Sequence, residues 1–167
     1  MTSLAGSFLV AKSVLQDPNF AQSVVLLLQH GPEGALGLVV NREATVEGLP
    51  FTVFVGGPCE SQGLFMLHGH AEWAKPSADD RKTQIAPGIF LGDATCAEQI
   101  TGSSEGQTFR FRMFAGYSGW GPDQLEREIA AGAWSVTPAT GELLFDTPAA
   151  ELWDRLAPPT IPQPSVN

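Results

Sequence analysis

The residues of this sequence that could carry chemistry are few, and one group of them alternates along the chain. His68, His70 and Glu72 are spaced by two. Alternate side chains of a strand point to one side, so two imidazoles and a carboxylate could share a metal ion. One strand rarely supplies a full ligand set, and histidines that are solvated or satisfied in the core are the favoured interpretation. We therefore expect no metal and no other cofactor.

A second candidate is the thiol of Cys59, which follows a Gly-Gly-Pro turn. A reactive thiolate needs a cationic side chain or a helix N-terminus beside it. The neighbour here is Glu60, so a small, partly buried cysteine without a catalytic or redox role is expected. A small hydrolase, or a thiol- or metal-dependent enzyme, built on the Cys59 or His68 region stays as the alternative. Such an enzyme would require Cys59, His68 and Arg42 within hydrogen-bond reach of one cleft.

A third candidate is the glycine-rich stretch 116–121, which precedes a predicted helix. Amides at such a corner can bind an anion. Asp123 and Glu126 fall in the first turn of that helix and would repel a phosphate, and P-loop spacing is missing. We expect a tight strand-to-helix corner across which Tyr117 and Trp120 pack. An aromatic-walled pocket for a small ligand or a peptide is the alternative.

Asn41 and Arg42 form the last polar candidate, at the end of an apolar run. The guanidinium could bind an anionic ligand, or it could pair with an acidic group and hold a loop. The chain has 18 acidic residues against nine Lys and Arg. In so acidic a chain the structural ion pair is favoured.

The elements that must position these residues are mainly short strands. Branched apolar runs predict strands over 8–11, 23–29, 35–40, 51–55, 63–70 and 88–91. The second and third of these should form a hairpin, and the continuous apolar run 23–29 should be covered on both faces. Alternation predicts a strand over 108–115 with Arg110 and Arg112 on its solvent side.

Helices are predicted mainly late in the chain. The ranges are a single turn at 45–49, a brief helix at 94–100, and helices at 122–131 and 147–156. Pro122 suits a first helical position and Gly132 suits a stop, with Leu125 and Ile129 on the buried side.

The end of the chain shows two further features. Short strands are predicted at 134–136 and 143–145, joined by a turn. The proline-rich stretch 158–167 should be a disordered tail, which leaves one α+β domain at 1–157.

Composition limits the function. The 167 residues are 43% hydrophobic and 16% charged, which is typical of a globular chain. The net charge of −9 opposes direct binding to nucleic acid, whose proteins neutralise phosphates. The longest aliphatic run, 24–28, is far short of the about 20 residues that span a bilayer. We expect a cytoplasmic protein without a membrane partner.

Five stretches then carry a family resemblance. They are Leu-Gln-Asp-Pro-Asn-Phe at 15–20 with Ser-Val-Val-Leu-Leu at 23–27, Gly-Ala-Leu-Gly-Leu-Val-Val-Asn-Arg at 34–42, Val-Gly-Gly-Pro at 55–58 with Leu-His at 67–68, Gly-Tyr-Ser-Gly-Trp-Gly-Pro at 116–122 with Gln-Leu-Glu at 124–126 and Gly-Ala-Trp at 132–134, and Phe-Asp-Thr-Pro at 145–148 with Leu-Trp at 152–153. In this order, over residues 6–156, they resemble the bacterial YqgE/AlgH family.

The resemblance implies a single α+β domain whose bifurcated mixed β-sheet curls into a pseudo-barrel with a few short helices. Members are cytosolic and mostly uncharacterised, and one branch is labelled a regulator of alginate transcription. No catalytic residue or cofactor is carried over. Glu43 stands where the family commonly has proline, Asp123 stands where it commonly has glycine, and the stretch 96–106 is shortened and polar.

We therefore expect a non-catalytic binding module for an unknown small molecule or protein, with any effect on transcription being indirect. Binding residues gather at strand ends and loops. The expected site residues are Asn41, Arg42, Gly56, Gly57, Pro58, His68, Gly116, Tyr117, Gly119, Trp120 and Gly121.

Overall fold

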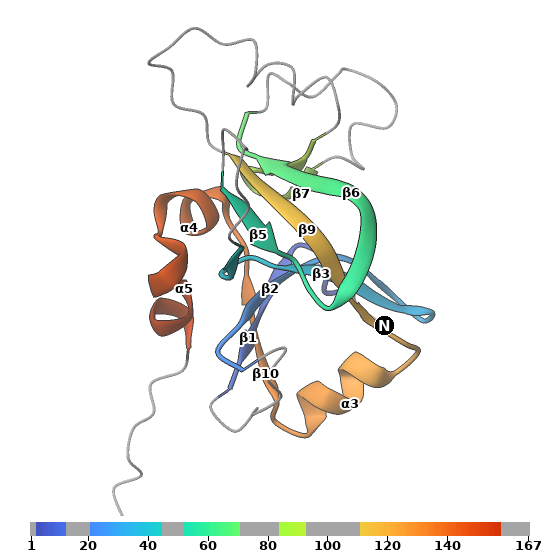
Figure 1. Ribbon diagram of the computed structural model, residues 1–167. Coiled ribbons are helices and arrows are strands. Elements are labelled where there is room, and N and C mark those ends of the chain that lie inside the picture. Colours follow the sequence, from blue (N-terminus) through green and yellow to red (C-terminus); the bar gives the residue numbers. More distant parts are fainter. Residues whose placement is uncertain (1–2, 13–20, 45–51, 71–83, 93–110, 158–167) are drawn as a thin grey trace, which may run out of the picture.

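Strands dominate the computed structural model, which describes residues 3–12, 21–44, 52–70, 84–92 and 111–157 (Figure 1). The strands are β1 (Ser7–Ala11), β2 (Val24–Gly31), β3 (Gly34–Val39), β4 (Glu43–Ala44), β5 (Val53–Val55), β6 (Cys59–His68), β7 (Gln84–Ala86), β8 (Ile89–Leu91), β9 (Phe111–Trp120) and β10 (Trp134–Pro138). The helices of the described part are α3 (Gln124–Ala130), α4 (Gly141–Asp146) and α5 (Ala149–Leu156). The helices expected at 45–49 and 94–100 and the tail expected at 158–167 lie outside the described residues.

The described strands form one mixed sheet in the order β10-β1-β2-β3-β9-β6-β8-β7. β9 has β6 along one edge, while its other edge pairs first with β5, in parallel, and then with β3. The sheet therefore bifurcates at β9 and curls into a half-barrel. This confirms the single α+β domain and the bifurcated, curled sheet that the family resemblance implied.

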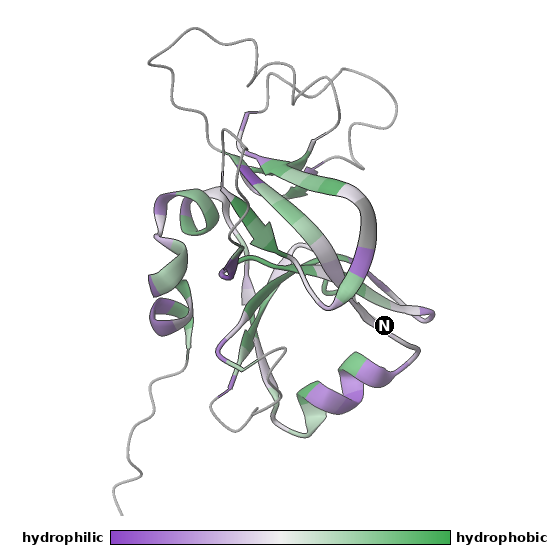
Figure 2. Cartoon of the chain, viewed as in Figure 1, coloured by the Kyte–Doolittle hydropathy of each residue, from purple (hydrophilic) through white to green (hydrophobic). Residues whose placement is uncertain are grey.

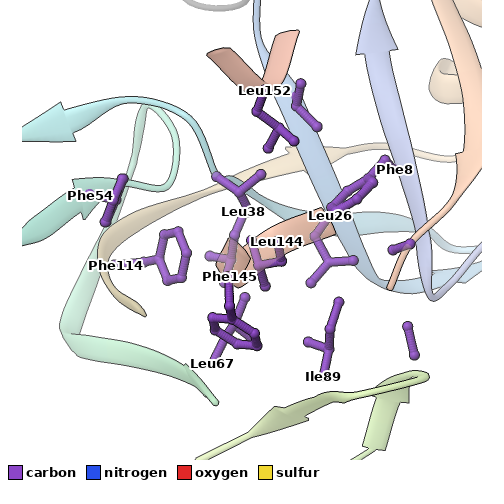
Figure 3. Close-up of a cluster of buried hydrophobic side chains, with 14 of the residues drawn as sticks. Phe8, Leu26, Leu38, Phe54, Leu67, Ile89, Phe114, Leu144, Phe145 and Leu152 are labelled. Carbon is purple, nitrogen blue, oxygen red and sulfur yellow. The ribbon is translucent and has the colours of Figure 1, made fainter. Parts of the chain in front are cut away.

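Both faces of the β1–β2–β3 part are buried. Alternate side chains of these strands pack with Leu144 of α4 and Leu152 of α5 in one cluster, part of which Figure 3 shows. The remaining side chains pack with Leu125 of α3 in a second cluster. Figure 2 shows the same division, with hydrophobic residues along the central strands and hydrophilic ones on the outer sides of α3 and α5. The predicted hairpin, with strands covered on both faces, is thus confirmed.

The strand predicted at 143–145 is wrong, because these residues lie in α4. Thr140 Oγ1 accepts a hydrogen bond from the backbone N–H of Leu143 at 3.2 Å, which satisfies an amide of the first helical turn. Three consecutive apolar residues fit a buried strand and a buried helix equally well. The capping threonine was the signal that distinguishes them.

The loop predicted at 116–121 is also wrong, because β9 continues through it to Trp120. Residues 118–120 pair with β3, so their backbone groups are used within the sheet. Helix α3 begins at Gln124 rather than at Pro122, since Asp123 has a left-handed backbone with φ 64°. The predicted stop is confirmed: Gly132 has φ 87°, and its N–H donates to Ile129 O at 3.0 Å.

Arg112 does not lie on a solvent face as predicted, since it is half-buried. Its guanidinium lies 5.6 Å from the ring centre of Phe54 and 5.9 Å from that of Phe145, and it donates to Phe145 O. Burial lowers the pKa of Arg112, although Glu43 and Asp146 act in the opposite direction. The cation therefore ties α4 to the sheet.

None of the helices in the described ranges has the length and hydropathy that a membrane crossing requires.

Candidate functional site

Three glycines let the β5–β6 connection press against β9, and we call Gly56, Gly57 and Gly116 the glycine crossing. Gly116 has φ 79°, and a Cβ there would lie 2.8 Å from Gly57 O and 2.9 Å from Cys59 O. A Cβ at Gly56 would collide with Gly116 O, and one at Gly57 would collide with Tyr117 O. The backbones are too close for any side chain, which is the physical reason for glycine at these positions.

Gly56 is the centre of the glycine crossing. Its N–H donates to Ala115 O at 2.8 Å, and its carbonyl oxygen accepts from the backbone N–H of Val39 at 2.8 Å. The same oxygen accepts from Ser118 Oγ at 3.1 Å. The residue therefore connects β3, β5 and β9 at the point where the sheet divides.

Next to the glycine crossing, β6 leaves β9 and a hollow opens. Cys59 pairs with Tyr117 and Leu64 with Ala115, so four β6 residues stand against one β9 residue and bow outward (Figure 1). The hollow has a volume of about 430 Å³, and we call it the apolar notch. Its lining residues are Gly57, Pro58, Cys59, Glu60, Gly63, Leu64, Ala115 and Gly116.

The rim of the apolar notch exposes large apolar side chains. Val55 pairs with Ala115 from one side and Leu64 pairs with it from the other, so the three side chains form a row on one face. Val55 is 39% exposed and Leu64 is 44% exposed. A row of exposed apolar residues that leads into a hollow is the usual mark of a binding surface.

The predicted site residues divide between several places. Gly57, Pro58 and Gly116 line the apolar notch, and Gly56 and Tyr117 adjoin it. The ring of Tyr117 packs edge-on against Phe65 with centroids 6.4 Å apart.

Asn41 and Arg42 hold the chain before β2. Asn41 Oδ1 accepts from the N–H of Val24 at 3.0 Å, and its Nδ2 donates to Gln22 O at 3.0 Å. Arg42 Nη2 donates to Ala21 O at 2.7 Å. These contacts fit the structural role that the sequence favoured, while the ion pair expected for Arg42 stays a prediction.

His68 lies far from the apolar notch and is 1% exposed. Its ring stacks on Phe90 with centroids 5.6 Å apart, and its Nδ1 accepts from the N–H of His70 at 3.1 Å. Glu72, the third member of the expected metal set, lies outside the described residues. Within the described ranges, no three of His, Cys, Asp and Glu gather as a metal would need.

Cys59 and His68 cannot act together. Cys59 pairs with Tyr117 and His68 pairs with Phe111, which places them roughly 20 Å apart along β9. Cys59 is a free, partly buried thiol, as the sequence predicted. The shared cleft of Cys59, His68 and Arg42 that the enzyme alternative required is not formed by these residues.

The chain matches the model of a family described as AlgH-like over residues 8–160. It belongs to the AlgH-like family. A UPF0301 protein of Myxococcus xanthus is 37% identical over 169 residues, covering 92% of this chain and 89% of the relative. A UPF0301 protein of Streptomyces coelicolor is 38% identical over 151 residues, covering 81% of this chain and 76% of the relative.

Two solved structures resemble this AlgH-like chain. The solution structure of the AlgH protein from Pseudomonas aeruginosa is 29% identical with a TM-score of 0.66, covering 88% of this chain and 83% of the other. A crystal structure of a Corynebacterium diphtheriae protein is 23% identical with a TM-score of 0.70, covering 93% and 85%. The second likeness concerns the fold alone.

In this AlgH-like chain, Trp120 belongs to a different environment from Tyr117, so the two rings do not pack across a corner as predicted. Trp120 is buried and packs edge-on against Trp134 with centroids 6.2 Å apart. Both indole N–H groups donate to the same oxygen, Glu128 Oε1, at 3.0 and 2.9 Å. Gln124 donates to the other carboxylate oxygen at 3.1 Å.

Sequence reasoning missed His30, which lies beside this cluster. Its Nδ1 accepts from the N–H of Leu4 at 2.9 Å, so the neutral ring carries its proton on Nε2, 2.6 Å from Glu126 Oε2. The hydrogen bond from His30 holds the pKa of Glu126 below its usual value, and a bond to the backbone of Glu126 adds to this. No local sequence pattern predicts the contact between His30 and Glu126, because these residues meet only when β3 pairs with β9.

Proposed function

We propose that this AlgH-like protein is a non-catalytic binding module that receives an apolar side chain of a protein partner in the apolar notch. The observation that carries the proposal is the row of Val55, Ala115 and Leu64, in which Val55 and Leu64 are exposed and which leads into a hollow of about 430 Å³. The glycine crossing forms a rigid floor of backbone, and such preformed sites lose little entropy on binding.

Charge indicates which partner fits. Glu60 lines the apolar notch, and the whole chain carries a net charge of −9. An apolar residue flanked by lysine or arginine would therefore be favoured over one flanked by acids. The same charge opposes phosphate backbones, so any effect on transcription would be exerted through the bound protein.

The enzyme alternative has less support. His68 is buried. Its partner on β9 is Phe111, which lies six residues from Tyr117, the β9 partner of Cys59. The thiol has Glu60 beside it in the sequence, and a thiolate is favoured by cations rather than by carboxylates. A binding role requires neither group to react.

A display library of random peptides tests the proposal directly. Peptides selected on the wild-type protein are expected to carry an apolar residue next to lysine or arginine. Leu64→Ser should weaken their binding about tenfold, the effect of losing roughly 1.4 kcal/mol of apolar contact. Alkylation of Cys59 with a bulky maleimide should block the same peptides by filling the hollow.

Val136→Ser is the matched control, because Val136 is 39% exposed on β10 and lies outside the notch lining. It should leave peptide binding unchanged. Both side chains are about two-fifths exposed and lie in strands, so each substitution should lower the free energy of unfolding by about 1 kcal/mol or less. Equal loss of binding in both variants, or a library that yields no binding peptide, would contradict the proposal.

A further inference from the structure

A second hollow lies beside the turn between β2 and β3, at the far end of β9 from Phe111. Its volume is about 570 Å³, and we call it the hairpin pocket. Its lining residues are Gln29, His30, Gly31, Pro32, Glu33, Gly34, Ala35, Leu36 and Trp120. None of these residues lines the apolar notch, so the two hollows are separate surfaces.

The walls of the hairpin pocket differ in chemistry. Leu36 pairs with Gln29, so these two side chains share one face of the hairpin, and Glu33 lies exposed at its turn. Ala35 and Trp120 pair on the other face and pack in the core cluster of α3. His30 contributes surface but no proton acceptor or donor, because Leu4 and Glu126 already bond its two nitrogens. The pocket thus offers one carboxylate and one amide next to hydrocarbon.

The electrostatic surroundings have one dominant sign. The carboxylate of Glu126 lies against His30 at the pocket, and Asp123 and Glu128 belong to the same α3 segment. Arg127 is the one cation in the sequence of that helix. An anionic ligand would meet repulsion here, and a cation would be attracted.

We propose that the hairpin pocket binds an aliphatic cation, with an ammonium or guanidinium group on Glu33 and Gln29 and its hydrocarbon part against Leu36. A cationic head on a flexible apolar stem matches such a divided lining. A free amine and a lysine or arginine side chain of a protein share this chemistry.

Amide NMR of the ¹⁵N-labelled full chain tests this with agmatine, a small guanidine that also carries an ammonium group. Saturable shift changes are expected at residues 29–36, with a dissociation constant of about 1–10 mM for so small a ligand. Glu33→Gln should weaken binding up to about fivefold, as the loss of one exposed ion pair does. Raising the salt concentration from about 0.1 M to about 1 M should weaken it as well.

Glu151→Gln is the control with the same change of charge, since α5 lies on the opposite side of the molecule from the β2–β3 hairpin (Figure 1). It should leave agmatine binding unchanged. A capped Gly-Arg-Gly peptide and n-butylguanidine carry the same single guanidinium and separate the two sources of the cation: tighter binding of the peptide assigns the pocket to a protein side chain, and tighter binding of butylguanidine assigns it to a free small molecule.

Three results would overturn the inference: no saturable shift with any of these probes, shifts spread evenly over acidic residues of α5, or equal effects of Glu33→Gln and Glu151→Gln. Leu64→Ser should not alter agmatine binding, because Leu64 lines the other hollow. Failure at the hairpin pocket is therefore distinguishable from failure at the apolar notch.

Discussion

The glycine crossing meets β9 at Gly116, close to the end of that strand that leads to α3, yet the two regions are held together differently. At the glycine crossing the contacts are mainly between backbones, and the side chains at the rim are apolar and exposed. At the α3 end, His30, Glu126 and Glu128 and the two indoles use their polar atoms on one another.

This difference indicates which side chains remain available to contact a ligand. The carboxylate of Glu128 accepts hydrogen bonds at both oxygens from within the fold, so it has little capacity left for a ligand. Val55 and Leu64 leave more than a third of their surface uncovered. Substitutions should therefore affect stability at the α3 end and at the glycine crossing, but affect binding at the rim of the apolar notch.

The largest expected effect comes from Gly116→Ala. A left-handed φ of 79° costs an alanine about 1–2 kcal/mol, and its Cβ would lie 2.8 and 2.9 Å from two backbone oxygens, which adds about 1–3 kcal/mol of overpacking. We expect unfolding in urea to show a loss of about 4 kcal/mol.

Gly63→Ala is the matched control, because a Cβ there would meet nothing within 4 Å and Gly63 is not among the glycines with positive φ. It should change the free energy of unfolding by less than about 1 kcal/mol. Similar losses in the two variants would show that the crossing does not need its glycine.

The next effect is expected from Glu128→Ala. It removes the acceptor of two indole N–H groups whose hydrogen bonds are partly buried, so each lost partner costs about 1–2 kcal/mol and a loss of about 2–4 kcal/mol should appear in urea unfolding. Glu128→Gln keeps an oxygen that can accept from both indoles and should recover most of that loss. Equal stability of the two variants would mean that these hydrogen bonds contribute nothing.

The smallest effect concerns pH. The folded-state pKa of Glu126 is depressed below 4.5, so its bond with His30 stabilises the fold fully above that pH and is lost as the pH falls through the lower value. Wild type should be more stable than Glu126→Gln near pH 7, and the difference should shrink below about pH 4. Chemical unfolding of both proteins across this range measures it, with Glu151→Gln as the control for losing a first-turn charge. A constant difference down to pH 3 would refute the assignment.

Local patterns predicted much of the fold. The continuous apolar run of β2 indicated a strand buried on two faces, and Gly132 indicated the end of α3. The pattern failed at Leu143, where three apolar residues fit two structures. It also failed at Gly116, where glycine was interpreted as a turn but permits a close approach of two strands.

The site was harder to predict because it depends on register. Gly57, Pro58 and Gly116 were expected together and do line one hollow. Leu64 was not singled out, since its exposure results from β6 bowing away from β9, which no single stretch of sequence specifies. His30 was missed for the same reason, because its partner Glu126 is distant in sequence.

The placement of β1 has a consequence for synthesis of the chain. β1 lies between β2 and β10, and Ala11 pairs with Trp134. One edge of β1 therefore stays unpaired and waits for β10, which is made near the end of translation. At roughly 5–20 residues per second that wait is on the order of ten seconds. During it the fully buried apolar segment Phe-Leu-Val-Ala of β1 presents an open edge, which is the kind that pairs with other chains. This edge of β1 therefore stays open until β10 has left the ribosome.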